Sequence, residues 1–242
     1  MMTPDQPRGL SKADESYHWV RSPVMIGIQF KKIVKRMLDP WIFIQRLPAA
    51  CVNAALLTFD DGPHSSLTPQ LLDVLDAYHA RACFFVVGEF AAAEPDLLRE
   101  ILARGHAIGN HTYSHSQRKP GGLSDAEDVY RCQQTIREIT GEETRLFRPP
   151  MGRVTITGTL ASRRLGAKQV LWSVEGGEWS YAKNQTAQEI AKRLAADIRS
   201  GDIVLLHDNN EKILTIVKTV LPALANRGLD LAPSVRHLIG FL

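Results

Sequence analysis

The feature that most constrains the fold is a regular alternation, from residue 54 onward, of short apolar runs with longer helical patterns. The predicted strands are Ala54–Phe59, Ala82–Val87, His106–Gly109, Arg145–Phe147, Lys168–Val174 and Asp202–Leu206. The predicted helices are Pro69–Tyr78, Asp96–Ala103, Asp125–Thr140, Ile156–Arg164, Ala187–Ser200 and Ile213–Ala225. Such alternation is typical of a parallel sheet, either doubly wound or closed into a barrel, because each helix returns the chain to begin the next strand in the same direction. The segment is short for a regular eightfold barrel of ~250 residues. We therefore expect an α/β fold, a distorted (β/α) barrel with about seven parallel strands.

Ionisable and metal-liganding side chains follow five of these predicted strands. The residues at the strand ends are Asp60, Asp61, His111, His115, Arg148, Glu175, Glu178, Trp179 and His207. Taken singly, the aspartates fit a turn and the paired histidines fit an exposed loop. In a parallel barrel, however, the carboxyl ends of all strands lie on one face, where functional sites are built. Their joint occurrence predicts a site on that face.

The residue types at this predicted site indicate metal chemistry. Two imidazoles and one carboxylate suit a divalent metal that keeps open positions for water and substrate. Zn²⁺ is the first expectation, with Co²⁺ or another divalent ion as alternatives. The same trio could hold Fe(II) in an oxygenase. A second carboxylate beside the ligands and a histidine across the site favour hydrolysis, because they could serve as base and acid.

Four ordered motifs carry a family resemblance. They are Thr58–His64 (TFDDGPH), His111–His115 (HTYSH), Arg148–Gly152 (RPPMG) and Leu205–His207 (LLH). In this order, at strand ends, they resemble the polysaccharide deacetylases of carbohydrate esterase family 4, the NodB-homology domain. The resemblance extends from about residue 54 to the carboxyl end and implies the same distorted barrel.

The resemblance also implies roles for individual residues. It implies a metal held by Asp61, His111 and His115. Asp60 would be the general base for the hydrolytic water, oriented by Arg148, and His207 would be the general acid for the leaving amine. The backbone N–H of Met151 would stabilise the oxyanion of the intermediate. Trp179 and Leu205 would form the walls of a small pocket for the acetyl methyl group.

The chain departs from the family pattern at three positions. Met151 stands where the family usually has Tyr, so the backbone N–H is kept but any contact of the Tyr side chain is lost. Glu175 and Glu178 replace two Asp residues before Trp179, which keeps the charge and adds a methylene. We expect these changes to affect the tuning of the catalytic histidine, the acyl group and the sugar accepted, more than the metal site.

The function that we expect is metal-dependent hydrolysis of an N-acyl group, acetyl by the resemblance, from a sugar residue. The substrate would be an oligosaccharide, a polysaccharide or a lipid-linked glycan, and the enzyme a hydrolase of linear amide carbon–nitrogen bonds. Two alternatives are a catalytically inactive carbohydrate-binding relative and the facial-triad Fe(II) oxygenase. Retention of the complete residue set argues against the inactive relative, because function is argued from the site rather than the fold.

We divide the chain into an amino-terminal extension, residues 1–50, and a deacetylase-like domain, residues 51–242. Within the extension, Ser22–Asp39 has apolar residues at helical spacing and four basic residues on much of the remainder. This pattern predicts a basic amphipathic helix. Packing against the main domain is the favoured interpretation, since apolar helix faces usually face a core. Peripheral membrane contact is the alternative.

Charge and cysteine content limit the partners and the compartment. The 29 basic residues exceed the 26 acidic ones by only 3, which does not indicate a nucleic-acid-binding protein. The polar first 21 residues lack the apolar core of a signal peptide, and no apolar stretch is long enough to span a bilayer. The three distant cysteines, Cys51, Cys83 and Cys132, are expected to be reduced thiols. We therefore expect a cytoplasmic protein of unspecified oligomeric state.

Overall fold

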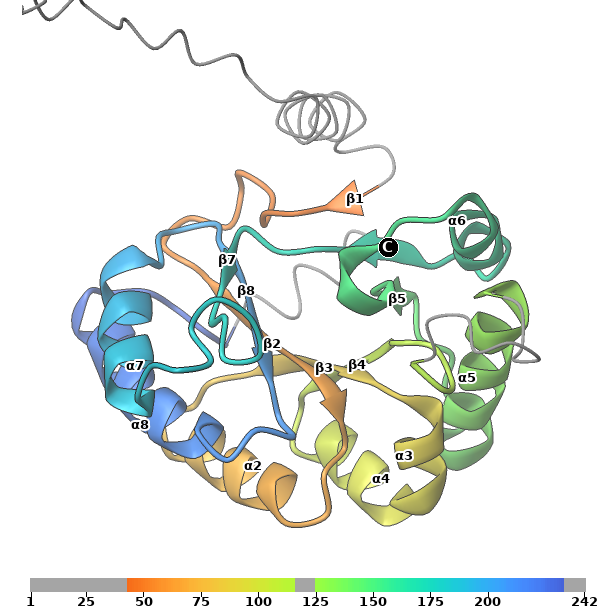
Figure 1. The fold of residues 1–242 in the computed structure, drawn as a ribbon, viewed down its shortest axis with the longest axis horizontal. Helices are drawn as coiled ribbons and strands as arrows, with labels where there is room; N and C mark the ends of the chain where they lie inside the picture. The colour runs from red at the N-terminus through yellow and green to blue at the C-terminus, as the bar shows by residue number, and fades with distance from the viewer. Residues whose placement is uncertain (1–42, 116–124, 233–242) are drawn as a thin grey trace, which may run out of the picture. The chain divides into compact units, whose positions relative to one another are not determined.

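The computed structural model of the protein describes residues 43–115 and 125–232. These residues build an eight-stranded parallel sheet in the order β1-β6-β5-β4-β3-β2-β8-β7, with helices along it (Figure 1). The strands are β1 (Phe43–Ile44), β2 (Leu56–Gly62), β3 (Ala82–Val86), β4 (Ala107–Asn110), β5 (Leu146–Phe147), β6 (Lys168–Val170), β7 (Val174–Glu175) and β8 (Ile203–His207). The helices are α2 (Leu67–Ala77), α3 (Gly88–Ala93), α4 (Pro95–Ala103), α5 (Asp125–Thr140), α6 (Ile156–Arg164), α7 (Ala187–Asp197) and α8 (Ile213–Asn226), with a 3₁₀ turn η1 (Pro150–Gly152).

The sheet curls into an incomplete barrel, as a short connection shows. After β6, the N–H of Leu171 donates to Ile44 of β1 at 2.7 Å, and the N–H of Ser173 donates to Ile203 of β8 at 3.0 Å. Two residues that are only two positions apart thus reach strands near opposite ends of the sheet, which requires those ends to approach each other. This crossing divides the single strand predicted over Lys168–Val174 into β6 and β7. The expected distorted (β/α) barrel is confirmed.

Two apolar layers hold the sheet in place, one on each face. Leu57 and Phe59 of β2 belong to a large cluster shared with the helices. Leu56 belongs to a second cluster, with Cys83 and Phe85 of β3, that contains no helical residue. Since successive side chains of a strand point to opposite faces, the second cluster fills the inside of the curled sheet. The inward positions above it on β2 are therefore available to the site.

Two elements are present that the sequence pattern did not predict. The helix α3 has only six residues, which is too short for a periodic apolar pattern to be recognised. The two-residue strand β1 pairs with β6 and lies before residue 51, where we had placed the start of the domain. The sheet therefore begins at least eight residues earlier than expected, because Phe43–Ile44 is too short to be recognised as a strand.

The structure tests some of the remaining expectations, on membrane-spanning helices and cysteines, and leaves the amino-terminal helix untested. The basic amphipathic helix predicted over 22–39 lies outside the described residues, so its packing or membrane contact stays a prediction. Among the described residues, none of the helices combines the length and the apolar character needed to cross a bilayer. Cys51, Cys83 and Cys132 are buried free thiols, as expected.

Candidate metal centre and active site

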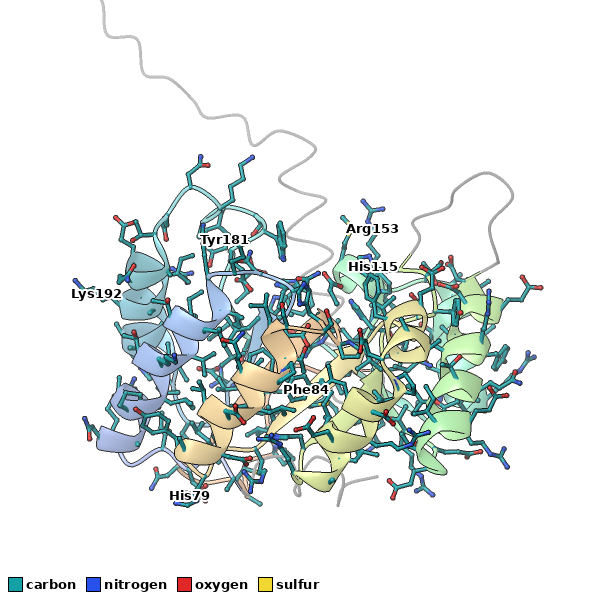
Figure 2. All side chains as sticks on the ribbon, turned by 90° about the horizontal axis from the view of Figure 1, so that it is seen from below. His79, Phe84, His115, Arg153, Tyr181 and Lys192 are labelled. Atoms are coloured by element: carbon teal, nitrogen blue, oxygen red, sulfur yellow. The ribbon has the colours of Figure 1, made fainter. Side chains whose placement is uncertain are left out.

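The site residues gather at the carboxyl-terminal end of the strands. Figure 2 shows His115, Arg153 and Tyr181, from three different loops, along one end of the fold, and His79 at the opposite end. Asp60 on β2 is in register with His207 on the neighbouring strand β8. The topology therefore places the two ionisable groups at equivalent heights on adjacent strands.

A bulge in β2 lets two consecutive aspartates contribute to the same site. The pairing of β2 with β3 shifts register between Asp60 and Gly62, and Asp61 has a φ of 70°. Alternation along a regular strand would send Asp60 and Asp61 to opposite faces, and a bulge removes that restriction. Aspartate is among the residues that best tolerate positive φ. The two carboxylates thus both lie beside His111.

The residues of the predicted metal site lie together. The Oδ1 atom of Asp61 is 3.4 Å from Nε2 of His111 and 3.3 Å from Nε2 of His115. These three ligand atoms all lie within 4.8 Å of one another. Oδ1 of Asp61 is buried and has no hydrogen-bond partner among the described residues. A buried carboxylate oxygen without a donor is costly unless a cation satisfies it, so the residues fit a divalent metal.

The surroundings of His111 and His115 suit both side chains to bind a metal through Nε2. Nδ1 of His111 lies 2.7 Å from the backbone carbonyl oxygen of Arg148. A proton on Nδ1 satisfies this contact and leaves Nε2 with a free electron pair directed at Asp61, as in most histidine metal ligands. Burial, and then the neighbouring His111, lower the pKa of His115, which favours its neutral form. Both imidazoles are therefore suited to coordination.

A buried arginine, Arg148, holds the carboxylate of Asp60 in place. Arg148 is completely buried, and its Nη1 atom donates to Oδ1 of Asp60 and to the hydroxyl of Thr58, both at 2.7 Å. Its Nε atom donates to the carbonyl of Val170 at 3.0 Å, and its guanidinium stacks on the Phe85 ring at 4.0 Å. With Oδ1 held by Arg148, Oδ2 of Asp60 faces His111 at 3.6 Å. Asp60 thus keeps one oxygen directed at the metal cluster.

A second ion pair supports the histidine across the site. Nδ1 of His207 lies 2.9 Å from Oε1 of Glu178, whose side chain is almost completely buried. Burial alone would lower the pKa of His207. The hydrogen bond and charge of Glu178, followed by the charges of Asp60 and Asp61, instead raise the pKa above its usual value. This shift favours the protonated form of His207, in which Nε2 carries a proton that it can donate.

The two glutamates that replace family aspartates have different positions. Glu178 contacts His207, as just described, whereas Oε2 of Glu175 accepts a hydrogen bond from the Trp172 indole at 3.0 Å. Only the Glu178 replacement is therefore in direct contact with the candidate acid. The longer Glu178 side chain still reaches the imidazole at hydrogen-bond distance.

The expected substrate-pocket residues occupy separate environments. Met151 is 56% exposed in the left-handed region (φ 53°), and Trp179 is also 56% exposed, with its indole N–H 3.3 Å from Oδ1 of Asn209. Leu205 is buried on β8, two residues before His207 and on the same side of the strand. A shared acetyl pocket between Trp179 and Leu205 stays a prediction.

Sequence reasoning assigned no role to one buried residue next to the site. Asp208 follows His207, is completely buried and accepts a hydrogen bond from the Thr68 hydroxyl at 2.7 Å. Burial raises its pKa to about 7. Its carboxylate lies where a Cβ on Gly62 would collide with it, so the glycine of the first motif leaves room for Asp208. The position of Asp208 directly after His207, at the end of a predicted strand, was the sequence feature that could have indicated its place in the site.

These features define the class of protein: an incomplete (β/α) barrel with a candidate Asp–His–His metal centre, a buried Asp–Arg pair and a histidine–glutamate pair at its strand ends. The polysaccharide deacetylase family profile matches residues 49–170. The chain belongs to the polysaccharide deacetylase family. The resemblance seen in the four motifs is confirmed.

Individual relatives agree with this assignment. A chitooligosaccharide deacetylase of Bradyrhizobium is 33% identical, over 75% of this chain and 89% of the relative. A peptidoglycan-N-acetylglucosamine deacetylase of Listeria monocytogenes is 31% identical over 81% of this chain, which spans only 41% of that longer protein. A family 4 carbohydrate esterase of Streptomyces lividans, solved with acetate, has a TM-score of 0.65 and 31% identity, covering 74% of this chain and 91% of the esterase.

Removing a candidate ligand should weaken metal binding. We expect His115→Ala to lower Zn²⁺ affinity by about 100-fold or more, because loss of an outer-shell partner alone typically costs roughly 10–100-fold. Isothermal titration of the metal-free protein measures this. His79→Ala, at the opposite end of the fold, is the control and should bind Zn²⁺ like the wild type. Equal affinities in the two variants would contradict the assignment of His115.

Proposed function

We propose that the protein is a metal-dependent N-deacetylase acting on N-acetylated sugar residues of a glycan. The observation that carries the proposal is the arrangement around Asp60. One oxygen is held by buried Arg148, the other faces the Asp61–His111–His115 cluster, and His207 lies at the same height on the next strand. A base, a metal cluster and an acid around one point are what amide hydrolysis requires.

The residues of the chain divide the work of the reaction. Asp60 accepts a proton from the attacking water, and Arg148 holds its carboxylate in orientation and supports its negative charge. His207, protonated through its pairing with Glu178, donates a proton to the departing amine. The backbone N–H of Met151, held in its left-handed conformation before Gly152, is available to the developing oxyanion. The products are acetate and a free amino sugar.

The proposed metal is Zn²⁺, with Co²⁺ as a second ion to test, held by Asp61, His111 and His115. When bound, such an ion polarises a carbonyl and makes water acidic near neutral pH. The mixed nitrogen and oxygen donors suit either ion.

The proposed substrate class comes from the relatives, whose names specify chitooligosaccharide and peptidoglycan N-acetylglucosamine. Both are glycans with an N-acetyl group on the sugar. The exposed rings of Trp179 and Tyr181 support this proposal, since they offer apolar faces beside the site. Cytoplasmic location and the alternatives of polysaccharide or lipid-linked glycan stay predictions.

The proposal is tested by measuring acetate release from N-acetylglucosamine oligomers and from peptidoglycan fragments, with Zn²⁺ or Co²⁺ present. Release of acetate together with a new free amine supports deacetylation. A metal-loaded protein that binds these glycans and releases nothing would be an inactive binding relative. Oxygen consumption with an oxo-acid cosubstrate would instead indicate the oxygenase.

The His207–Glu178 pair predicts a specific pH dependence. A general acid works only below its own pKa, and Glu178 raises the pKa of His207. Glu178→Gln removes that charge, so the pKa of His207 should fall and the alkaline limb of the kcat profile should move to lower pH. The exposed Glu211 provides the matched control, Glu211→Gln. An alkaline limb at the wild-type position in Glu178→Gln would contradict His207 as the acid.

A further inference from the structure

The outward face of α6 is more apolar than its inward face. Ile156 is 81% exposed and Leu160 is 51% exposed, whereas the buried positions are Gly158, Ala161 and Ser162. Helices on soluble domains normally direct their large apolar side chains toward the core. The large side chains of α6 therefore do not serve the packing of this helix against α5 and β6, its neighbours in the fold.

The apolar face continues to the rim of the site. Met151, whose backbone is assigned to the oxyanion, is 56% exposed, and Val154 is 39% exposed. Arg153, between them in sequence, lies along the same end of the fold as His115 (Figure 2). Four of the large apolar side chains that are exposed among the described residues thus fall within residues 151–160.

Positive charge accompanies these apolar side chains. Residues 144–174 contain no acidic residue, and of their basic residues Arg148 is buried and paired with Asp60, whereas Arg163 and Arg164 are exposed. Arg163 and Arg164 follow Ile156 by seven and eight residues. At helical spacing they lie on the same side of α6 as Ile156 and Leu160, about 10–12 Å from Ile156 along the helix axis. Among the described residues, neither arginine forms a salt bridge. An acidic neighbour from α5, Asp125, accepts a hydrogen bond from Thr157, which is on the side of α6 toward α5.

We propose that this surface, Met151, Val154, Ile156, Leu160, Arg163 and Arg164, docks on an anionic lipid bilayer. Exposed apolar side chains can insert at a membrane interface, and the neighbouring arginines can attract anionic headgroups. Each basic residue near an anionic leaflet raises partitioning about fivefold. A second copy of the chain fits less well, because a symmetric contact would place the same arginines against each other.

The proposed docking puts one edge of the active site at the membrane surface. Ile156 begins α6 at the catalytic end of the barrel, so the bilayer would border the rim beside Met151 rather than cover the strand ends. Glycans attached to the membrane, or lying against it, would then reach the site from the rim. Docking itself requires no turnover and is separable from the proposed deacetylation.

The test is co-sedimentation of the full chain with vesicles of phosphatidylcholine containing about one third phosphatidylglycerol, and with pure phosphatidylcholine vesicles. We expect Arg163→Gln/Arg164→Gln to lower binding to anionic vesicles roughly 30-fold. Ile156→Ser/Leu160→Ser should lower it roughly tenfold or more, because each loses an inserted apolar side chain. Both variants change exposed positions and should keep the wild-type Tm.

Matched controls carry the same changes elsewhere on the surface. Lys192→Gln/Lys218→Gln, on α7 and α8, and Val52→Ser/Tyr78→Ser should each bind anionic vesicles within about twofold of the wild type. Absence of wild-type binding, or α6 variants that bind like the controls, would overturn the proposal. So would an Ile156→Ser/Leu160→Ser variant whose only change is a shifted monomer–dimer equilibrium. Acetate release from soluble oligomers is measured in parallel, so failure of the deacetylase proposal is recognised independently.

Discussion

Replacing Arg148 by Met is expected to lower the free energy of unfolding by about 3–5 kcal/mol, the typical effect of removing one partner of a buried ion pair. The Asp60 carboxylate, which is 3% exposed, would lose the guanidinium donor at 2.7 Å. The carbonyls of Val170 and Leu171 would also lose their donor. Urea unfolding followed by circular dichroism measures the change.

The matched control is Arg163→Met, which makes the same substitution at an exposed position of α6. A surface change of this kind normally alters stability by no more than about 0.5 kcal/mol. The comparison removes any general effect of exchanging arginine for methionine. If the two variants unfold at the same urea concentration, with equal slopes, Arg148 does not stabilise the barrel interior in the way that its contacts indicate.

Replacing Asp60 by Asn is expected to lower kcat by roughly 10²–10⁴-fold, the usual contribution of a general base. Asparagine has nearly the same shape and still offers an oxygen to Nη1 of Arg148, so the barrel interior should stay intact. Because Asp61, His111 and His115 are unchanged, Zn²⁺ affinity should change little. Turnover and Zn²⁺ titration are measured on the same preparation.

The control for this variant is Asp96→Asn, whose exposed carboxylate on α4 pairs with surface Arg99. It should show wild-type turnover. An Asp60→Asn variant with wild-type kcat would remove Asp60 from the reaction. A variant that lost its metal would instead assign Asp60 to the metal centre.

The alternation of strands and helices was sufficient to predict the fold, because each long element carries its own periodic pattern. The amphipathic helices α4, α5 and α8 begin and end within a few residues of their predicted bounds. Elements of two to six residues were not predictable in this way. The strand β1, the helix α3 and the division of Lys168–Val174 depend on how the sheet curls, which is a tertiary property.

The candidate site could be located from sequence, but its internal contacts could not. Strand-end positions placed Asp60 and His207 on one face, and the structure brings them into register. Which glutamate supports His207 depends on the path of the β7–α7 loop, and only the structure separates Glu178 from Glu175. The surface of α6 for which we propose membrane docking was not predicted from sequence either, because the exposure of Ile156 and Leu160 depends on how the helix packs in the fold.

The most direct test of the central claim is acetate release from an N-acetylglucosamine oligomer before and after removal of the metal. We predict release by the Zn²⁺-loaded protein, loss after chelation, and recovery with about one equivalent of Zn²⁺, consistent with the single Asp61–His111–His115 cluster found in the described residues. Undiminished release by the metal-free protein would contradict the claim of metal dependence. Absence of release by the fully loaded protein from oligomers and peptidoglycan fragments alike would contradict the claim of deacetylation.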